Sequence, residues 1–300
     1  MLPIQLQLPS DFYKEEVKND FLVTRSRKEV WAVELDLLMQ FDKVCKKNNL
    51  TYFLDGGTLL GAVRHKGFIP WDDDIDVEMF REDYDKLVRI ADQEFEHPYF
   101  FQSAYSDKGY VRSHSQLRNS NTCGALSHEV HKVNFNQGIF LDIFVLDGVP
   151  NDQEKLDEQM RFLQKYSAKM WEIVCPRMNS RIKYMVKIIR RQIYIRFGIL
   201  KSMYRRFEEC AKTYEDSEEV ALLTFYRNSE HIKRFPKEWY HDTLLMPFET
   251  LMCPIPSGYR EILTLYYGEN YMIPQKAENC HGELIIDTKR SYKEVLKGMK

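Results

Sequence analysis

Apolar residues recur every three or four positions in four segments of the chain, which are 30–47, 81–95, 152–174 and 181–214. In the first of these, Trp31, Leu35, Leu38 and Val44 fall on one side of a helical wheel. Apolar positions with this period predict amphipathic helices that bury one face.

Two further segments have patterns typical of strands. Ile75, Val77 and Met79 alternate with acidic residues over 74–79, which predicts a strand with one acidic face. Residues 138–146 are apolar apart from Asp142, as expected of a buried strand. A shorter apolar run over 50–54 predicts a third strand.

The fold class follows from the order of these segments. Strands and helices are mixed up to residue 150, and Asp147-Gly148 followed by Pro150 marks a candidate boundary. We therefore predict an α/β (α+β) protein with a mixed sheet and flanking helices. The expected parts are an N-terminal extension (1–29), an α/β core (30–150) and a mainly helical region (151–300) that packs on the core.

The acidic strand is the first candidate site. A strand points alternate residues to one face, so Asp74 and Asp76 lie side by side, whereas Asp72 and Asp73 are interpreted as loop residues. Neighbouring carboxylates repel unless a cation lies between them, and hard oxygen ligands suit Mg²⁺ or Mn²⁺. The alternative is a solvated acidic loop. The apolar neighbours of the cluster, such as Trp71, favour the metal site.

Asp142 extends this candidate site. A lone carboxylate within an apolar strand costs several kcal/mol, roughly, unless it is paired or bound to metal. We interpret Asp142 as a third metal ligand, or as a group that accepts a proton. The alternative is a strand-end aspartate that accepts hydrogen bonds from backbone amides.

Gly56-Gly57 lies between a predicted strand and a helix that Thr58 is placed to cap and that closes at Gly67. Glycines let a phosphate approach the backbone, and the following helix N-terminus adds partial positive charge. A glycine pair alone is also typical of a tight turn. The order of strand, Gly-Gly, helix and acidic strand matches the nucleotidyltransferase fold.

Composition and charge limit the class of protein. The chain has 300 residues, 44% hydrophobic content and a net charge of −2, and its six cysteines contain no CxxC pair. The first residues lack the basic-then-apolar layout of a secretory signal, and no apolar run approaches the ~20 residues that span a bilayer. We expect a cytoplasmic protein with free thiols that is either soluble or lies on a membrane surface.

Residues 177–206 carry ten Lys and Arg and no acidic residue, with apolar positions at helical spacing and Gly198 as a candidate bend. One interpretation is a helix packed on the core with its basic side in solvent. Another is a peripheral membrane contact, or attraction to an anionic glycan precursor. Nucleic acid is a less favoured partner because no nucleic-acid motif accompanies the charge.

Three blocks of sequence resemble one known family. Residues 53–77, 138–150 and 266–281 closely resemble the signature, the second block and the C-terminal block of the LicD family, which is similar to fukutin-related proteins. Val145 departs from the proline that many members have. The match covers residues 30–281, and its first block is long enough to be specific.

This resemblance implies a cholinephosphotransferase. Residues 30–150 would then form a nucleotidyltransferase-like catalytic core, and the helical region 151–300 would face the acceptor or a membrane. Members transfer phosphocholine from CDP-choline to a sugar hydroxyl of teichoic acid or lipopolysaccharide, an anionic or lipid-linked glycan acceptor, and release CMP. Residues matched to the donor phosphate and nucleotide are Gly56, Gly57, Thr58, Arg64 and Arg118. Those matched to Mg²⁺ (or Mn²⁺) and catalysis are Asp74, Asp76 and Asp142. Further candidates are Trp71 as a choline contact, His65, Lys66 and His281.

Other functions stay open at this stage. The chain is also compatible with transfer of another CDP-linked alcohol phosphate, such as ribitol or glycerol, or with a true nucleotidyltransferase. A metal-dependent glycosyltransferase fits the upstream glycines less well. Outside enzymes, an anionic-surface binding protein would use only the basic helix. The identity of the products separates the enzymes, because phosphocholine transfer releases CMP whereas a true nucleotidyltransferase releases pyrophosphate. Mg²⁺-dependent binding of CDP-choline would exclude a protein that only binds anionic surfaces.

Overall fold

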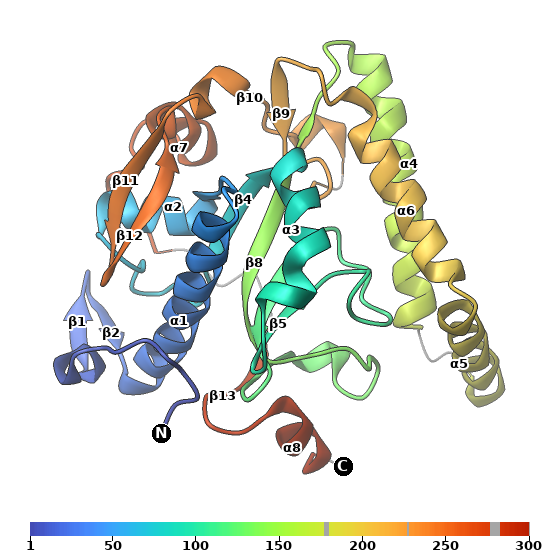
Figure 1. Cartoon of the computed structure of the whole chain (residues 1–300), viewed down its shortest axis with the longest axis horizontal. Helices are drawn as coiled ribbons and strands as arrows, with labels where there is room; N and C mark the ends of the chain where they lie inside the picture. Colours follow the sequence, from blue (N-terminus) through green and yellow to red (C-terminus); the bar gives the residue numbers. More distant parts are fainter. Residues whose placement is uncertain (177–179, 227, 277–282, 300) are drawn as a thin grey trace.

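A computed structural model describes residues 1–176, 180–226, 228–276 and 283–299 (Figure 1). The chain begins with a 3-10 turn, η1 (Ser10–Tyr13), and a hairpin of β1 (Glu16–Lys18) and β2 (Phe21–Val23). Helix α1 (Arg25–Lys47) follows, and the Thr24 side chain caps it by accepting the Arg27 amide.

The central sheet has seven strands, and its main path runs β10-β9-β8-β4-β3. Strands β5 and β6 join it through β6, which pairs with β8. The bounds are β3 (Phe53–Leu54), β4 (Asp76–Phe80), β5 (Tyr99–Gln102), β6 (Ser115–Asn119), β8 (Ile139–Gly148), β9 (Glu219–Ala221) and β10 (Phe235–Pro236).

Strand β8 organises this sheet because it pairs along both of its edges. It runs parallel to β4 on one side and antiparallel to β6 and β9 on the other. Strand β9 is antiparallel to β8 at its C-terminal end, so residues beyond 150 complete the sheet. A strand paired on both edges and covered on its faces is apolar throughout, which explains the sequence of 138–146.

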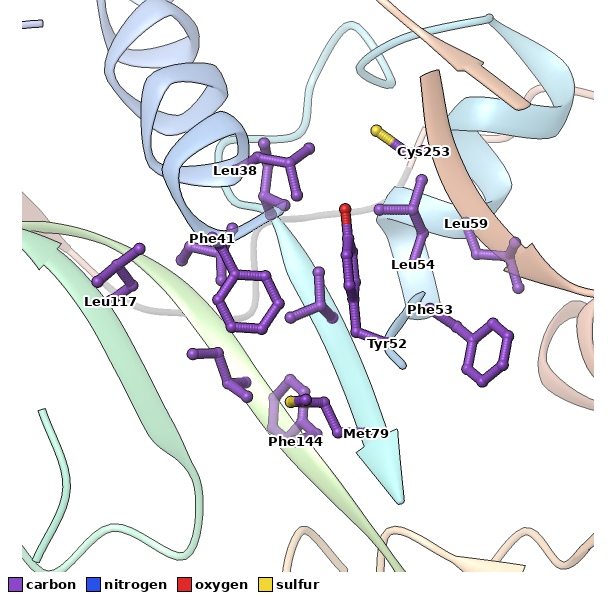
Figure 2. Close-up of a cluster of buried hydrophobic side chains, with 14 of the residues drawn as sticks. Leu38, Phe41, Tyr52, Phe53, Leu54, Leu59, Met79, Leu117, Phe144 and Cys253 are labelled. Atoms are coloured by element: carbon purple, nitrogen blue, oxygen red, sulfur yellow. The ribbon is translucent and has the colours of Figure 1, made fainter. Parts of the chain in front are cut away.

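Helices pack on this sheet and enclose the main core. Helix α1 and helix α3 (Arg81–Glu94) contact β8, whereas helix α2 (Gly56–Arg64) contacts β4. Figure 2 shows the core around Phe41 of α1, Leu54 of β3 and Phe144 of β8, whose side chains are buried together. The mixed α/β fold with flanking helices, predicted from the sequence, is confirmed.

Three helices after residue 150 form a separate layer with its own core. Helices α4 (Gln153–Val174) and α6 (Ile199–Ala211) pack side by side, and α5 (Arg181–Arg196) continues beyond them at one end (Figure 1). The single helix expected over 181–214 is in fact two, because Gly198 adopts φ +68, a left-handed conformation that favours glycine. The predicted bend at Gly198 is therefore confirmed.

The remaining elements lie around this framework. They are β7 (Cys123–Leu126), η2 (Ser127–Glu129), η3 (Lys212–Tyr214), η4 (Ser229–His231), η5 (Lys237–Tyr240), β11 (Thr243–Phe248), β12 (Leu251–Pro256), α7 (Tyr259–Tyr267), β13 (Leu284–Asp287) and α8 (Tyr292–Lys297). Strands β11 and β12 form a hairpin, and β13 returns to pair with β7.

Two chemical expectations can be compared with the described residues. Cys45, Cys123, Cys175, Cys210 and Cys253 are free thiols, as predicted, and Cys280 lies outside the described part. Within the described ranges, the model contains no helix with the length and apolarity needed to span a bilayer.

Candidate active site

One cavity of about 780 Å³ lies where the start of α2, the loop before β4, strands β6 and β8, and helix α7 meet. Its volume falls within the range of ~300–1,000 Å³ typical of small-molecule sites. Sequence-predicted residues that line it are Gly56, Gly57, Arg64, Trp71, Asp74, Asp76, Arg118 and Asp142. The structure thus gathers residues from distant parts of the chain into one site.

The two central carboxylates come from neighbouring strands. Asp76 on β4 and Asp142 on β8 are register partners in the parallel pair, so both strands present a carboxylate to the same cavity. Burial raises the pKa of Asp76 well above its usual value, and the charges of Asp74 and Asp142 raise it further. Of the two carboxyls, Asp76 therefore has the greater tendency to hold a proton.

Asp142 has the opposite electrostatic environment. Its Oδ1 accepts the Gln116 amide at 2.6 Å and lies 3.4 Å from Nε2 of His114. Burial alone would raise the pKa of Asp142, but His114, Gln116 and Arg112 outweigh it and hold the pKa below its usual value. The two neighbouring carboxyls therefore have pKa values shifted in opposite directions, that of Asp76 upward and that of Asp142 downward.

Gly56 and Gly57 begin α2 directly against the acidic residues. Gly56 has φ +51, and a Cβ there would stand 3.6 Å from Oδ2 of Asp76. A Cβ on Gly57 would approach Oδ2 of Asp72 to 2.6 Å, so a side chain at this position would displace that carboxylate. Gly56 is therefore favoured by its left-handed backbone conformation, and Gly57 by the close approach of the Asp72 carboxylate.

The prediction that Thr58 caps α2 is wrong. The cap position is Asp55, and Thr58 is the third residue of the helix, buried and outside the cavity lining. Its hydroxyl accepts the backbone N–H of Asp76 at 2.9 Å. The helix begins at Gly56, directly after Asp55, and therefore earlier than expected. The Thr58 hydroxyl instead positions the start of β4. The helix also ends at Arg64 and not at Gly67.

The acidic loop differs in detail from the predicted strand. Strand β4 begins at Asp76, so Asp74 precedes it, and Asp72 lines the cavity together with Asp74. One carboxylate oxygen each from Asp72, Asp73 and Asp74 lies within 4.8 Å of the others. Asp74, Asp76 and Asp142 do not form a group as tight as this. Asp72 lies in a loop, as predicted, but it also lines the cavity and so belongs with the site.

Arg118 lines the cavity, but its guanidinium donates its hydrogen bonds to neighbouring protein groups. Its N–H groups are hydrogen-bonded to Gln102, to the Gly138 carbonyl and to Gln116, and the guanidinium stacks on Phe140 at 4.8 Å from the ring centroid. Burial lowers the pKa of Arg118 to about 10, so it stays charged at neutral pH. Arg118 thereby holds Gln116, which in turn donates to Asp142.

The basic residues 64–66 of the first sequence block lie in two different environments. Arg64 lines the cavity, where Nη1 donates to the Tyr271 carbonyl at 2.8 Å. His65 and Lys66 are not part of the lining. Burial and the neighbouring Arg64 lower the pKa of His65 to about 4. His281 lies outside the described residues.

Aromatic side chains cover much of the remaining wall, namely Trp71, Phe140, Phe144, Phe225, Tyr226, Tyr266, Tyr267 and Tyr271. Trp71 is half-buried and packs edge-to-face on Phe21 at 6.3 Å, so it both lines the cavity and packs on the core. Burial first, and then the charge of Asp55, raises the pKa of Tyr266 and Tyr267, so both hydroxyls stay protonated beside the acidic residues.

Sequence reasoning missed several lining residues, above all His114, Gln116, Arg112 and Asp55. A signal existed for the first two, because His114, Gln116 and Arg118 alternate and therefore share one face of a strand. Asp55 is buried, which raises its pKa to about 6 against the opposing effects of the Gly56 amide and the Tyr266 hydroxyl. Arg112 forms an ion pair with Glu129, and its charge also lowers the pKa of Asp142.

The region that forms the cavity also matches the model of a known protein family. Residues 49–170 match the family model described as LicD/FKTN/FKRP, nucleotidyltransferase domain. The match includes α2, the acidic loop, β4, β6 and β8, which together supply most of the cavity.

Three relatives show how far the similarity extends. The lipopolysaccharide cholinephosphotransferase LicD of Haemophilus influenzae is 26% identical over 253 residues, which cover 84% of this chain and 93% of the relative. An uncharacterized protein of Rickettsia prowazekii is 32% identical over 47% of this chain and 48% of its own length. Human ribitol 5-phosphate transferase FKRP is 48% identical over 51 residues, only 17% of this chain and 10% of the relative.

Proposed function

We propose that this chain, whose residues 49–170 match the LicD/FKTN/FKRP nucleotidyltransferase domain, is a cholinephosphotransferase. It would transfer phosphocholine from CDP-choline to a sugar hydroxyl of a cell-surface glycan precursor, such as teichoic acid or lipopolysaccharide, and release CMP. The observation that carries the proposal is the cavity in which Asp76 and Asp142 meet beside Gly56-Gly57. The coverage of 93% of the Haemophilus LicD supports the same chemistry for the whole chain.

In the proposed reaction, the acceptor hydroxyl oxygen attacks the phosphorus that carries choline. A new P–O bond forms to the sugar as the P–O bond to CMP breaks, and the hydroxyl proton passes to a carboxylate. Asp142 suits this role because His114 and Gln116 keep it ionised and hold its orientation. CMP then departs with the electron pair of the broken bond.

A divalent cation fits the residues of this site. Asp72, Asp74, Asp76 and Asp142 supply hard oxygen ligands, and their mutual repulsion is relieved when a cation binds. Mg²⁺ (or Mn²⁺) held there would neutralise charge on the donor diphosphate. The amides at the start of α2 would face the same phosphates.

The aromatic wall supports choline as the transferred group. A quaternary ammonium is held best against aromatic faces, and Trp71, Phe225 and Tyr226 all line the cavity. Transfer of ribitol phosphate is the second candidate, because the FKRP relative is a ribitol 5-phosphate transferase. Ribitol is a neutral polyol that needs hydrogen-bond partners more than aromatic faces.

The direct test compares CDP-choline, CDP-ribitol and CDP-glycerol as donors, each with Mg²⁺ and a bacterial glycan precursor. We expect CMP release with transfer of phosphocholine to the acceptor, and little release from the other donors. Pyrophosphate release from a nucleoside triphosphate would show a true nucleotidyltransferase and overturn the proposal. Preference for CDP-ribitol would favour the second candidate.

A metal titration at two pH values tests the carboxylates themselves. The raised pKa of Asp76 means that the folded, metal-free protein keeps a proton that the unfolded chain loses near pH ~4. Its contribution to stability is therefore lost as pH rises from about 4 through the raised value, and a cation restores it by replacing the proton.

We expect Mg²⁺ or Mn²⁺ to raise the melting temperature more at pH 8 than at pH 5.5, with a gain of about 2.7 kcal/mol at a hundred times the dissociation constant. Differential scanning fluorimetry with and without EDTA measures this shift. An equal shift at both pH values would mean that the cation does not compete with the proton on Asp76.

A further inference from the structure

Helix α5 presents an apolar face that the other described residues of the chain leave uncovered. Ile182 is 76% exposed and Phe197, its C-terminal cap residue, is 75% exposed. The exposed apolar residues of this face are Ile182, Met185, Val186, Ile189, Ile193 and Phe197. Their spacing of three and four places them along one side of the helix.

The face is exposed because the opposite side of α5 is anchored. Arg191 is buried there, and its Nη1 donates to the carbonyls of Val174 at 3.0 Å and Lys132 at 2.6 Å. Ile195 packs on the core of the helical layer. The break at Gly198 separates this helix from α6, in which Leu200 and Tyr204 are buried. One interpretation of this segment was a helix packed on the core. That packing is observed for α6 but not for the outer face of α5.

Charge on and around the helix identifies the partner. Between residues 180 and 207 the chain has nine Lys and Arg and no acidic residue, and Lys183, Arg190 and Arg196 are exposed on α5 itself. An apolar stripe flanked by cations matches the acyl boundary and the anionic headgroups of a lipid surface. A second copy of the chain is a poor match, because its α5 would bring the same positive charges into contact.

We propose that the outer face of α5 inserts into the surface of an anionic lipid bilayer and holds the protein there. The helix is connected to the cavity through Lys132, whose ammonium donates to the His128 carbonyl at 2.7 Å. His128 and Glu129 line the cavity. A bilayer bound at α5 is therefore linked to the wall of the site through a short chain of hydrogen bonds.

The test is co-sedimentation of the full chain with vesicles of phosphatidylglycerol mixed with phosphatidylcholine, compared with phosphatidylcholine alone. We expect binding to the anionic vesicles and at least a tenfold weaker affinity when Ile182, Ile189 and Phe197 are replaced together by Ser. The matched control replaces three exposed apolar residues on other elements, Leu22→Ser, Leu245→Ser and Met252→Ser, and should bind like the wild type.

A second pair of variants separates charge from apolar contact. Lys183→Gln with Arg190→Gln should weaken binding at low salt, whereas Lys14→Gln with Lys43→Gln should not. Thermal melts of every variant show whether the fold is kept. Adding Ile189→Trp should also give fluorescence that brominated lipids quench beyond the wild-type signal.

Four results would overturn the proposal. They are no retention of the wild type on anionic vesicles, equal affinity of the triple Ser variant, a dimer that this variant abolishes without any lipid binding, and binding to RNA or DNA in place of vesicles. The readout is independent of enzymatic turnover, so failure of the proposed reaction leaves the membrane test intact, and the reverse also holds.

Discussion

Replacing Asp76 by Asn should lower the turnover rate by at least ~10³-fold while the protein stays folded. The carboxylate lies at the centre of the acidic site, where Asp74, Asp142 and Asp55 add to the cost of its burial. An amide of the same shape keeps the packing but binds a cation poorly. Initial rates of CMP release at saturating CDP-choline and Mg²⁺ measure the loss.

The same substitution should make the metal-free protein more stable at pH 8, because it removes a buried charge that its neighbours repel. The variant should also gain much less from Mg²⁺ than the wild type does. A variant that is more stable than the wild type without metal, but gains less stability from Mg²⁺, has lost a metal ligand and is not misfolded. Asp92→Asn, on the exposed side of α3, is the matched control and should change neither quantity. Wild-type turnover in Asp76→Asn would refute the assignment of the site.

The largest loss of stability is expected from Asp147→Asn, at about 3–5 kcal/mol. Asp147 is fully buried and receives two hydrogen bonds from Arg81, from Nε at 2.7 Å and from Nη2 at 2.8 Å. The pair joins the end of β8 to the start of α3, and Glu208 of α6 lies 3.5 Å from the same guanidinium. Removing the aspartate charge leaves Arg81 buried with only part of its compensation.

Chemical denaturation measures this loss, and a surface pair provides the comparison. Glu82→Gln breaks the exposed contact with Lys86 and should cost less than ~1 kcal/mol. The double variant Arg81→Met with Asp147→Leu should recover much of the loss, since it removes both buried charges together. Equal losses of unfolding free energy at the two sites would show that the buried ion pair stabilises the fold no more than the surface pair does.

The sequence was sufficient for the strands that carry the two central carboxylates. A strand is read from local pattern alone, so β4 and β8 were predicted within two residues, as was the interior position of Asp142. The pairing of these two strands was not predicted, because the register between Asp76 and Asp142, which are 66 positions apart in the chain, depends on the whole sheet.

Other features were missed because they depend on tertiary contacts. Asp55 and Thr58 are both good capping residues, and only the position of β4 decides that Thr58 faces the Asp76 amide. Arg118 was expected to contact phosphate, but its partners on β5 and β6 direct its donors inward. The exposed face of α5 required knowledge of which side Arg191 anchors.

The register between β4 and β8 also has an evolutionary consequence. Asp76 and Asp142 are held by backbone pairing of two adjacent strands, so the segment between them does not determine their separation. That segment contains α3, β5, β6 and β7 and supplies His114, Arg112 and His128 to the cavity wall. Insertions or substitutions there can change which donor or acceptor fits, while the distance between the two carboxylates is inherited unchanged.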